Sequence, residues 1–227
     1  MIMSFVPTTL TTAPLAPLLH QLFADAAVSS ARLREQAADI SAAELAELMG
    51  SKTAYRAFYG RVKDAHLAVS PETGRLLYML ARSTSARHIV EFGTSFGIST
   101  LHLAAALRDN GGGRVIGSEF EPTKVAAARA NISAAGLDDL VEIREGDALE
   151  SLAKDLPTEI DLLLLDGAKG LYPEILALIE PRLRRGALVV ADNADWSPDY
   201  LARVRSVDQG YLSLPFAGDV ELSLRIG

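Results

Sequence analysis

Hydrophobic and polar positions repeat along most of the chain with two alternating periods, and this pattern predicts a regular succession of strands and helices. Beyond residue 70, short apolar runs that suit buried strands are separated by longer segments with apolar residues at helical spacing. Strands separated by helices in this way predict an α/β fold with a doubly wound, mostly parallel sheet. The predicted strands are 88–92, 114–119, 140–145, 160–166 and 186–192, and the predicted helices are 97–108, 122–135, 148–154, 171–183 and 198–206.

The C-terminal residues depart from this alternation. Two strand-like runs, 210–216 and 219–226, are separated only by a short turn that contains Gly218. This spacing predicts an antiparallel hairpin at the edge of the sheet, which completes a seven-stranded sheet.

Residues 1–66 precede the alternation, and we expect them to form an extension that packs on a main domain of residues 67–227. An irregular arm rich in Thr and Pro is predicted over 1–17. Helices are predicted at 18–38, from the capping box Ser41–Glu44 to Met49, at 53–66, and from Pro71 with Ser70 as its N-cap. Apolar residues recur at helical spacing near the end of this extension and suit a core or a dimer contact, with a substrate wall as the alternative; they are Tyr55, Phe58, Tyr59 and Val62.

Composition excludes several kinds of function. The 227 residues suffice for one large α/β domain with a helical extension, and 49% hydrophobic with 22% charged residues is ordinary for a soluble globular protein. The net charge is −7 without a block of Lys or Arg, so nucleic acid and anionic membranes are not expected as partners. The absence of cysteine excludes disulfides, thiolate metal sites and a cysteine nucleophile. No apolar segment approaches membrane-spanning length and the first residues lack a basic start, so we expect a cytoplasmic protein.

A glycine-containing loop follows the first predicted strand. Gly93 and Gly97 permit a tight turn and the close approach of a ligand. They are four residues apart, which differs from the G-x-G-x-x-G of dinucleotide enzymes. Glu91, at the end of the strand, would repel a pyrophosphate and attract an ammonium group. The motif alone also fits a plain strand–helix turn.

Acidic residues follow the next two strands. Glu119 stands about 20 residues beyond the glycine loop, where nucleotide-binding sheets place an acid that accepts hydrogen bonds from ribose hydroxyls. Glu121 is the competing candidate. Asp147 suits an adenine edge, although a helix N-cap explains it as well. These strand ends together suggest an adenosine-containing ligand with a positively charged, phosphate-free tail, and S-adenosylmethionine is the obvious one.

Two buried strands end in carboxylates. Four leucines lead into Asp166, with Lys169 three residues later, and a second apolar run leads into Asp192 and Asn193. Because adjacent parallel strands lie about 5 Å apart, the two carboxylates can share a ligand. Their repulsion requires a cation or a proton, and an all-oxygen donor set suits a hard cation such as Mg²⁺. A helix cap by Asp192 or Asn193 is the alternative, and Lys169 is the candidate base.

These motifs resemble those of the cation-dependent O-methyltransferases of the catechol and caffeoyl-CoA type, which include small bacterial members. The resemblance covers residues from about 66 to 227. It implies a class I methyltransferase fold of the Rossmann type, S-adenosylmethionine and Mg²⁺ as cofactors, and a homodimer. The matching segments are HIVEFGTSFGIST, VIGSEFEP, NISAAGL, GDALESL, DLLLLDGAKGLY and LRRGALVVADN, of which the last two are the most specific.

The resemblance also implies a role for each matching residue. Asp166, Asp192 and Asn193 would bind the metal, and Lys169 would be the catalytic base beside Asp166. Ser95 replaces an aromatic residue of the catechol enzymes. The implied cofactor-binding residues are Val69, Glu91, Gly93, Ser95 and Ser99 at the methionine end, Glu119 at the ribose, Asp147 and Ala148 at the adenine, and Asp166.

Further departures from the family pattern concern the acceptor. Gly167 and Ala168 stand where the catechol enzymes have a histidine and an aromatic residue, so we expect a reduced cofactor wall and a wider pocket. Glu221 is the nearest match to an acidic residue that holds the second substrate hydroxyl, and Asp219 is the alternative. Trp196, the single tryptophan, suits the flank of an aromatic substrate or ordinary packing.

The expected activity is a Mg²⁺-dependent transfer of a methyl group from S-adenosylmethionine to a hydroxyl of a catechol-like aromatic small molecule. Lys169 would accept the proton of the acceptor hydroxyl, and alignment of the reacting atoms would supply most of the rate gain. The alternatives are an amine, a carbon, or a sugar or antibiotic hydroxyl as acceptor, a nicotinamide dehydrogenase, and a silent cofactor-binding protein. Glu91 and the glycine spacing disfavour the dehydrogenase.

Overall fold

The computed structural model describes residues 7–36, 50–53, 60, 62, 64–216 and 218–227. The helix predicted from Ser41–Glu44 to Met49 lies outside the described residues, as do the aromatic residues Tyr55, Phe58 and Tyr59. No helix within the described ranges is both long enough and apolar enough to cross a membrane.

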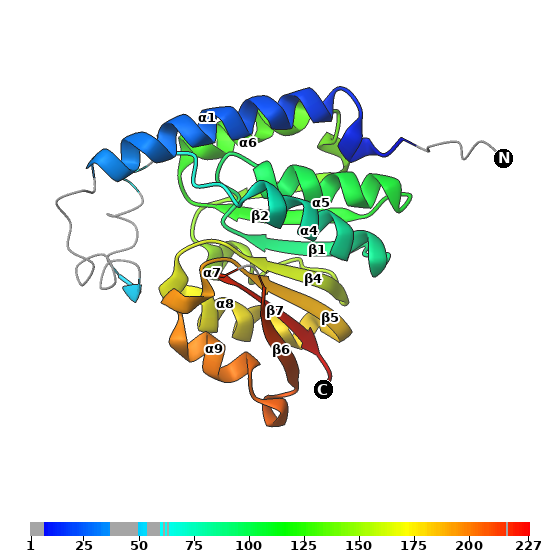
Figure 1. Ribbon diagram of the computed structural model, residues 1–227. Coiled ribbons are helices and arrows are strands. Elements are labelled where there is room, and N and C mark those ends of the chain that lie inside the picture. The colour runs from blue at the N-terminus through cyan, green and yellow to red at the C-terminus, as the bar shows by residue number, and fades with distance from the viewer. Residues whose placement is uncertain (1–6, 37–49, 54–59, 61, 63, 217) are drawn as a thin grey trace.

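A seven-stranded sheet forms the centre of the molecule, with the strand order β3-β2-β1-β4-β5-β7-β6 (Figure 1). Strands β1 to β5 pair in parallel, and β7 pairs antiparallel with both β5 and β6. The predicted α/β fold with a mostly parallel sheet and a C-terminal hairpin is therefore confirmed. The strands are β1 His88–Phe92, β2 Arg114–Glu119, β3 Val141–Glu145, β4 Ile160–Leu165, β5 Leu183–Ala191, β6 Tyr211–Phe216 and β7 Val220–Arg225.

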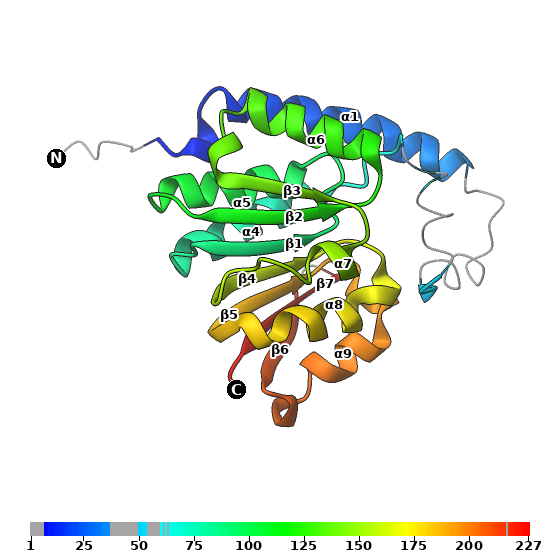
Figure 2. The same cartoon turned by 180° about the vertical axis from the view of Figure 1, so that it is seen from behind.

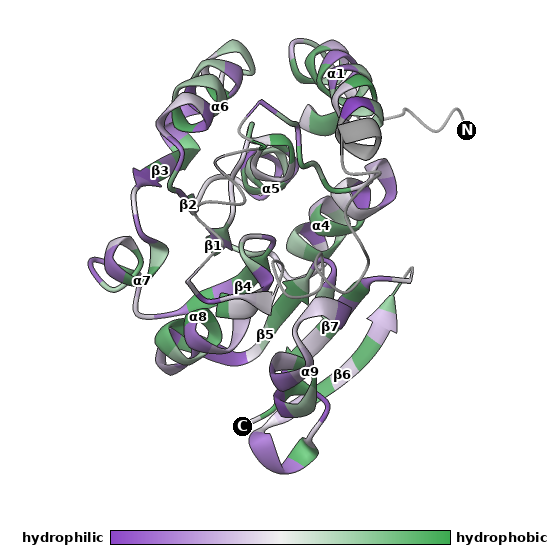
Figure 3. Cartoon of the chain, turned by 90° about the vertical axis from the view of Figure 1, so that its left-hand side faces the viewer, coloured by the Kyte–Doolittle hydropathy of each residue, from purple (hydrophilic) through white to green (hydrophobic). Residues whose placement is uncertain are grey.

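Helices cover both faces of the sheet (Figures 2 and 3). Residues of α1, α4, α5 and α6 form one apolar core, and residues of α7, α8 and α9 form the other. Leu162 and Leu164 of β4 enter the first core while Leu163 and Leu165 enter the second, which explains the unbroken apolar run of this strand. The helices are α1 Leu15–Gln36, α4 Pro71–Ser83, α5 Ile98–Asp109, α6 Pro122–Ala134, α7 Ala148–Ser151, α8 Tyr172–Ile179 and α9 Pro198–Val204.

The N-terminal helix α1 is part of the first core. Its buried side chains Leu15, Leu19, Leu22 and Ala26 follow one helical face and pack with the residues of α4 and α5. The helix begins within the arm that was predicted to be irregular. Pro17 falls in its first turn, where a missing N–H removes no helical hydrogen bond. The extension expected to pack on the main domain therefore contributes to its core.

Candidate active site

The loop after β1 lies against the end of β4. Gly93 has a φ of +99°, which L side chains rarely adopt, and a Cβ at this position would lie 2.6 Å from the backbone of Asp166. Gly97, with a φ of +86°, is the N-cap residue of α5. Gly93 thus lets this loop touch the strand end that carries the central carboxylate, while a Cβ on Gly97 would lie 3.4 Å from Ala128 of α6.

Glu119 holds the same loop from the end of β2. Its Oε2 accepts the N–H of Ser95 at 2.8 Å, and its Oε1 accepts the N–H groups of Phe120 and Glu121, both at 2.9 Å. These backbone donors hold the carboxylate in place and leave further lone pairs for a ligand. Glu121, the competing candidate, caps α6 by accepting the N–H of Thr123.

A cleft of about 650 Å³, including its open mouth, runs along the C-terminal ends of β1, β2 and β4. Both Glu119 and Glu121 line it. Many of the residues predicted to bind the cofactor meet there; they are Gly93, Ser95, Glu119, Asp147, Ala148 and Asp166. The size and the acidic ribose position suit an adenosine-containing ligand.

A smaller hollow of about 240 Å³ continues past the glycine loop, and the predicted residues Val69 and Ser99 line it with Asp166. The position of Asp147 is compatible with both of the roles considered for it. It lines the larger cleft and also caps α7, because its Oδ1 accepts the N–H of Leu149 at 2.9 Å. The cleft and the hollow together hold every predicted cofactor residue except Glu91.

Glu91 lies beneath these hollows. Its side chain is 0% exposed, and it accepts hydrogen bonds from the hydroxyls of Thr94 (3.0 Å), Ser99 (2.6 Å) and Thr100 (2.5 Å). Burial raises the pKa of Glu91 to about 7, although the three hydroxyls oppose that shift. The expected direct contact with a cofactor ammonium is therefore not present in this geometry. Glu91 instead stabilises the first turn of α5 through its hydrogen bonds, including the one from Ser99.

Asp166 and Lys169 lie side by side just beyond the end of β4. The Nζ of Lys169 donates a hydrogen bond to Oδ1 of Asp166 at 3.0 Å and lies 5.4 Å from the centre of the Tyr172 ring. Lys169 is only 3% exposed. Burial raises the pKa of Asp166, and the charge of Lys169 opposes the shift. An enclosed lysine beside a carboxylate suits proton transfer to or from a bound ligand.

Asp192 emerges beside Asp166, as the parallel pairing of β4 with β5 predicts. The N–H of Asp192 donates to the carbonyl oxygen of Leu165 at 2.9 Å, and the carboxyl groups of Asp192 and Asp166 share a hydrogen bond. Burial, followed by the repulsion from Asp166, raises the pKa of Asp192 to about 8. Two such carboxyl groups require a proton or a cation between them.

Asn193 and Asp219 extend this polar cluster. Asn193 has a φ of +50°, and its Nδ2 donates to Oδ2 of Asp219 at 3.0 Å, which leaves the amide oxygen available as a ligand. Two carboxylates with this amide oxygen fit a hard divalent cation. The part of the chain that the structure describes holds no metal-binding group of three or more His, Cys, Asp or Glu, so a metal held here would need the amide as its third protein ligand.

A cavity of about 870 Å³, including its mouth, opens over these groups. Asp166, Lys169, Asp192, Asn193 and Asp219 all line it. Asp166 also lines the cleft and the smaller hollow, so the three spaces meet at one carboxylate. We call the 870 Å³ cavity the carboxylate cavity. A ligand in the cleft and a second ligand in the carboxylate cavity would therefore approach each other at Asp166.

Glu221, predicted to hold the substrate, lies elsewhere. It is 1% exposed on β7 and accepts hydrogen bonds from the guanidinium of Arg205 at 2.9 and 2.7 Å and from the hydroxyl of Ser213 at 2.6 Å. It lines neither the cofactor cleft nor the carboxylate cavity. The geometry therefore does not support the assignment of Glu221, because its carboxylate pairs with the half-exposed Arg205. Its alternative, Asp219, takes the place beside Asn193.

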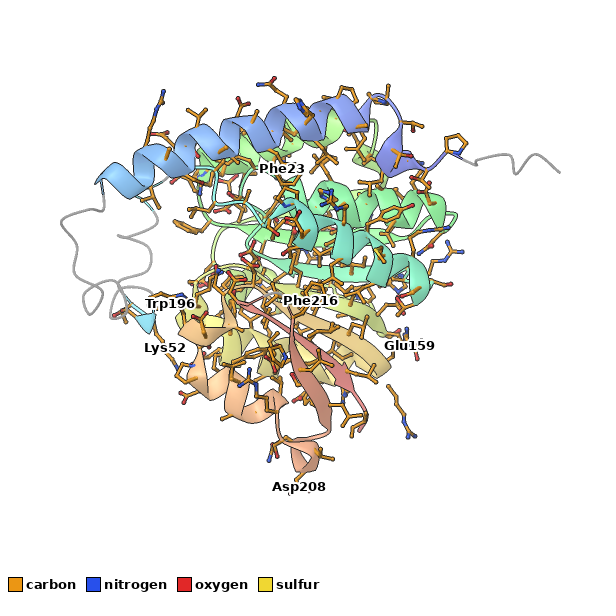
Figure 4. The ribbon with its side chains drawn as sticks, viewed as in Figure 1. Phe23, Lys52, Glu159, Trp196, Asp208 and Phe216 are labelled. Atoms are coloured by element: carbon orange, nitrogen blue, oxygen red, sulfur yellow. The ribbon has the colours of Figure 1, made fainter. Side chains whose placement is uncertain are left out.

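Trp196 also lies outside the carboxylate cavity. It lines a separate cavity with Lys52 and Gly170, and Figure 4 shows its side chain on the same side of the molecule as Lys52. The structure thus does not bring Trp196 together with Asp166 and Asp192, and its predicted place beside the acceptor is not supported by this geometry.

Phe92 supplies part of the wall that was expected to be missing at Gly167. A Cβ on Gly167 would lie 2.6 Å from the ring of Phe92, so the ring fills the space where the family's histidine would begin. Both residues line the cofactor cleft. The wall of the cofactor cleft is therefore not open at this position, because the ring of Phe92 from β1 lies against the small residue.

Two residues that no motif identified also line these spaces. Lys124, in the first turn of α6, is 3% exposed and lies 5.7 Å from the centre of the Phe96 ring, and burial lowers its pKa. His66 lines both the smaller hollow and the carboxylate cavity. The sequence predicted the other site residues mainly from acidic residues at the ends of strands. Neither Lys124 nor His66 stands at such a position.

Comparisons with known proteins agree with this geometry. Residues 38–214 match the model of a family described as O-methyltransferase. The chain is 38% identical over 130 residues to a catechol O-methyltransferase of Niastella koreensis and 35% identical over 127 residues to a catechol O-methyltransferase of Mycobacterium tuberculosis. Each alignment covers 56% of this chain, and they cover 58% and 57% of the relatives. The matched segment thus spans less than two thirds of the length of these curated relatives.

Solved structures show the same relationship. TomG from Streptomyces achromogenes, an O-methyltransferase in complex with SAM, is 26% identical with a TM-score of 0.63, over 85% of this chain and 95% of that chain. Cofactor-bound Rv0187 from MTB is 27% identical with a TM-score of 0.64, over 81% of this chain and 94% of that chain. Since the family model covers more than half of the sequence and the fold agrees, the chain belongs to the O-methyltransferase family.

Proposed function

We propose that this protein transfers the methyl group of S-adenosylmethionine to one hydroxyl of an ortho-dihydroxy aromatic small molecule, in a Mg²⁺-dependent reaction. The proposal rests mainly on the position of Asp166. It lines the cleft suited to an adenosine cofactor and also the cavity that holds Lys169, Asp192 and Asn193. The names of the two catechol O-methyltransferase relatives support an aromatic diol as the acceptor.

The cofactor cleft would orient the methyl donor. Glu119 is held by three backbone N–H groups and retains lone pairs for two ribose hydroxyls. Asp147 and Ala148 line the same cleft at the start of α7, directly after Gly146, whose N–H donates to the carbonyl oxygen of Glu119, and they suit the adenine. The hollow lined by Val69 and Ser99 would receive the methionine end. Such positioning converts an encounter of two molecules into a reaction between aligned groups.

Asp166, Asp192 and Asn193 would hold the divalent cation. The cation would supply positive charge that favours the ionised form of a neighbouring acceptor hydroxyl. The raised pKa of Asp192 supports this assignment, because burial beside Asp166 leaves the pair in need of positive charge. Asp219 would keep the Asn193 amide oriented through its 3.0 Å hydrogen bond.

Lys169 would accept the proton of the acceptor hydroxyl. Its Nζ lies in the carboxylate cavity, 3.0 Å from Asp166, and little of the side chain is exposed. A buried ammonium is costly, so the neutral amine is favoured when Asp166 is engaged by a cation. Tyr172 keeps the lysine in place, since the ring lies under Nζ and the Tyr172 hydroxyl donates to the carbonyl oxygen of Asp192 at 2.8 Å.

Calorimetric titration tests the ligand assignment directly. The purified protein should bind S-adenosylmethionine and should not bind NAD, since Gly93 and Gly97 lack the dinucleotide spacing. Mg²⁺ should bind to the wild type and to Asp195→Asn, an exposed control, and should lose most of its affinity in Asp192→Asn. Binding of NAD in place of S-adenosylmethionine, or Mg²⁺ binding unaffected by Asp192→Asn, would contradict the proposal.

A further inference from the structure

His66 stands at the boundary between the predicted methionine end of the cofactor site and the acceptor cavity. It lines the smaller hollow together with Ser99, and it lines the carboxylate cavity together with Asp166 and Lys169. It belongs to the segment that leads into α4, and no residue of the metal or base assignment comes from this segment. A side chain at this boundary faces the region where the acceptor would lie.

Two contacts fix the orientation of the His66 ring. It stacks on Phe96 of the glycine loop, with ring centres 3.8 Å apart and an angle of 9° between the planes. Its backbone N–H donates to the hydroxyl of Ser29 in α1 at 2.9 Å. The stack holds one face of the ring and the hydrogen bond holds the backbone of the residue. The two ring nitrogens take part in neither contact and can bind other partners.

The polar edge of His66 has no hydrogen-bond partner among the described residues. Nδ1 is enclosed and has no hydrogen-bond partner there, and Nε2 makes no hydrogen bond to another described residue. Burial lowers the pKa of His66, which keeps the imidazole neutral, so one nitrogen donates and the other accepts. An enclosed polar atom without a partner is destabilising, and a bound ligand that supplies the partner recovers this loss.

The charges of the cavity restrict that ligand. Three carboxylates line it, those of Asp166, Asp192 and Asp219, and among its described lining residues Lys169 is the only lysine or arginine. Since Lys169 already pairs with Asp166, the described lining offers no further cation to an anionic substituent. Ser30, Ser70 and Thr73 add hydroxyls to the same wall. The lining therefore suits an acceptor with neutral polar groups.

We propose that His66 determines acceptor specificity by hydrogen-bonding a neutral hydroxyl or carbonyl that the aromatic acceptor carries in addition to its two vicinal hydroxyls. This inference rests on the proposed function. The imidazole would contact the substituent across the cavity from Asp192 and Asn193, while the Phe96 stack keeps the ring from turning away. A carboxylate in the place of the carbonyl would meet the acidic lining and would be disfavoured.

The test compares two acceptors that differ only in this substituent. 3,4-Dihydroxybenzaldehyde carries a carbonyl, 4-methylcatechol carries a methyl group, and kcat and KM are measured for both with saturating S-adenosylmethionine and Mg²⁺. His66→Phe keeps the stack on Phe96 and removes the hydrogen bond. His20→Phe, an exposed position on α1, is the matched control. 3,4-Dihydroxybenzoate serves as the anionic acceptor.

The wild type and His20→Phe should prefer the aldehyde over 4-methylcatechol by about fivefold in kcat/KM, the worth of one hydrogen bond. His66→Phe should lose this preference, with a KM for the aldehyde that rises relative to the KM for 4-methylcatechol. If His66→Phe keeps the preference for the aldehyde, or if the benzoate is methylated as efficiently as the aldehyde, this inference is overturned while the proposed function stands. Failure of the wild type on every ortho-dihydroxy compound overturns the proposed function and this inference with it.

Discussion

At the scale of single residues, Asp166 and Lys169 follow the same strand and form a 3.0 Å hydrogen bond. Their roles can be assigned in two ways. One makes Asp166 the acid and Lys169 the base. The other makes Asp166 a metal ligand, and we favour it because Asp192 lies against Asp166 with its pKa raised to about 8. A carboxyl pair in this state favours a cation, whereas Lys169 faces the acceptor cavity and is suited to receive a proton.

Replacement of Lys169 tests its role as the base. Lys169→Ala should lower kcat for an ortho-dihydroxy acceptor by about 10²–10⁴-fold, the usual contribution of general base catalysis, and should change the Kd of S-adenosylmethionine by less than about threefold. Lys154→Ala, at an exposed position, is the control. Steady-state kinetics with calorimetry measures both quantities. If the variant turns over at the wild-type rate, Lys169 is not the base.

The carboxyl pair also predicts how stability depends on pH. In the folded, metal-free protein the pKa of Asp192 is about 8, against an ordinary value of 3.8. Between these values the folded state binds more protons than the unfolded state, so this group's contribution to the free energy of unfolding falls as the pH rises. His102, whose pKa is lowered by burial, acts in the opposite direction. The informative quantity is therefore the difference between wild type and Asp192→Asn.

Urea unfolding in the presence of a chelator, at several pH values from about 5 to 8, measures that difference. Relative to the wild type, Asp192→Asn should become progressively more stable as the pH rises, because it has no carboxylate to ionise in a buried place. Asp195→Asn should follow the wild type, since this side chain is exposed. A constant difference between Asp192→Asn and the wild type across this range would show that Asp192 is ionised throughout.

At the scale of elements, the carboxyl ends of the parallel strands account for most of what the sequence predicted correctly. An apolar run with an acidic residue at its end located Glu119, Asp166 and Asp192, because neighbouring parallel strands end at the same edge of the sheet. Residues that approach from other elements carry no such signal. His66 and Lys124 were missed for this reason.

The C-terminal hairpin shows where the pattern was insufficient. Glu221 and its neighbours Val220 and Leu222 alternate between opposite faces of β7, and only the structure fixes which face meets the site. Glu221 faces Arg205, whereas Asp219, in the turn, reaches Asn193.

Strand β5 shows a similar limit. It begins at Leu183 instead of residue 186, since Leu183 pairs with Ile160 of β4 and Arg184 forms an ion pair with Asp161 of the same strand, contacts that no local period can reveal.

The glycine loop provides a test at this scale. Gly93→Ala should destabilise the protein by about 2 kcal/mol more than Gly111→Ala, because only at Gly93 would a Cβ meet backbone atoms at 2.6 Å. Both glycines have positive φ, +99° and +87°, so the backbone strain is matched. Urea unfolding measures the difference, and calorimetry should show that only Gly93→Ala loses affinity for S-adenosylmethionine. Equal effects of the two substitutions would refute the close approach of this loop to Asp166.

At the scale of the whole molecule, α1 joins the N-terminal residues to the sheet. Leu19 is 6% exposed in the same core as Leu101 and Leu164, although these residues are far apart in the sequence. The helix also carries Ser29, which holds the backbone of His66. Packing of α1 is therefore linked to the acceptor cavity as well as to stability.

Unfolding of the N-terminal and C-terminal halves should accordingly be a single transition. Leu19→Ala should lower the free energy of unfolding by about 3 kcal/mol, as expected for a cavity in a core. Val28→Ala, 55% exposed on the same helix, should change it by less than about 0.5 kcal/mol. Circular dichroism and the fluorescence of Trp196, the single tryptophan, should report the same midpoint. Separate midpoints would show that α1 unfolds independently of the sheet.

The most direct test of the proposed function is the rate of methyl transfer from S-adenosylmethionine to catechol, measured with Mg²⁺, with EDTA, and with phenol in place of catechol. We predict a monomethylated product from catechol that requires Mg²⁺, disappears with EDTA and in Asp166→Ala, and is not formed from phenol, which lacks the second oxygen. Methylation that persists with EDTA and in Asp166→Ala, or that proceeds equally well with phenol, would contradict a cation held by Asp166, Asp192 and Asn193.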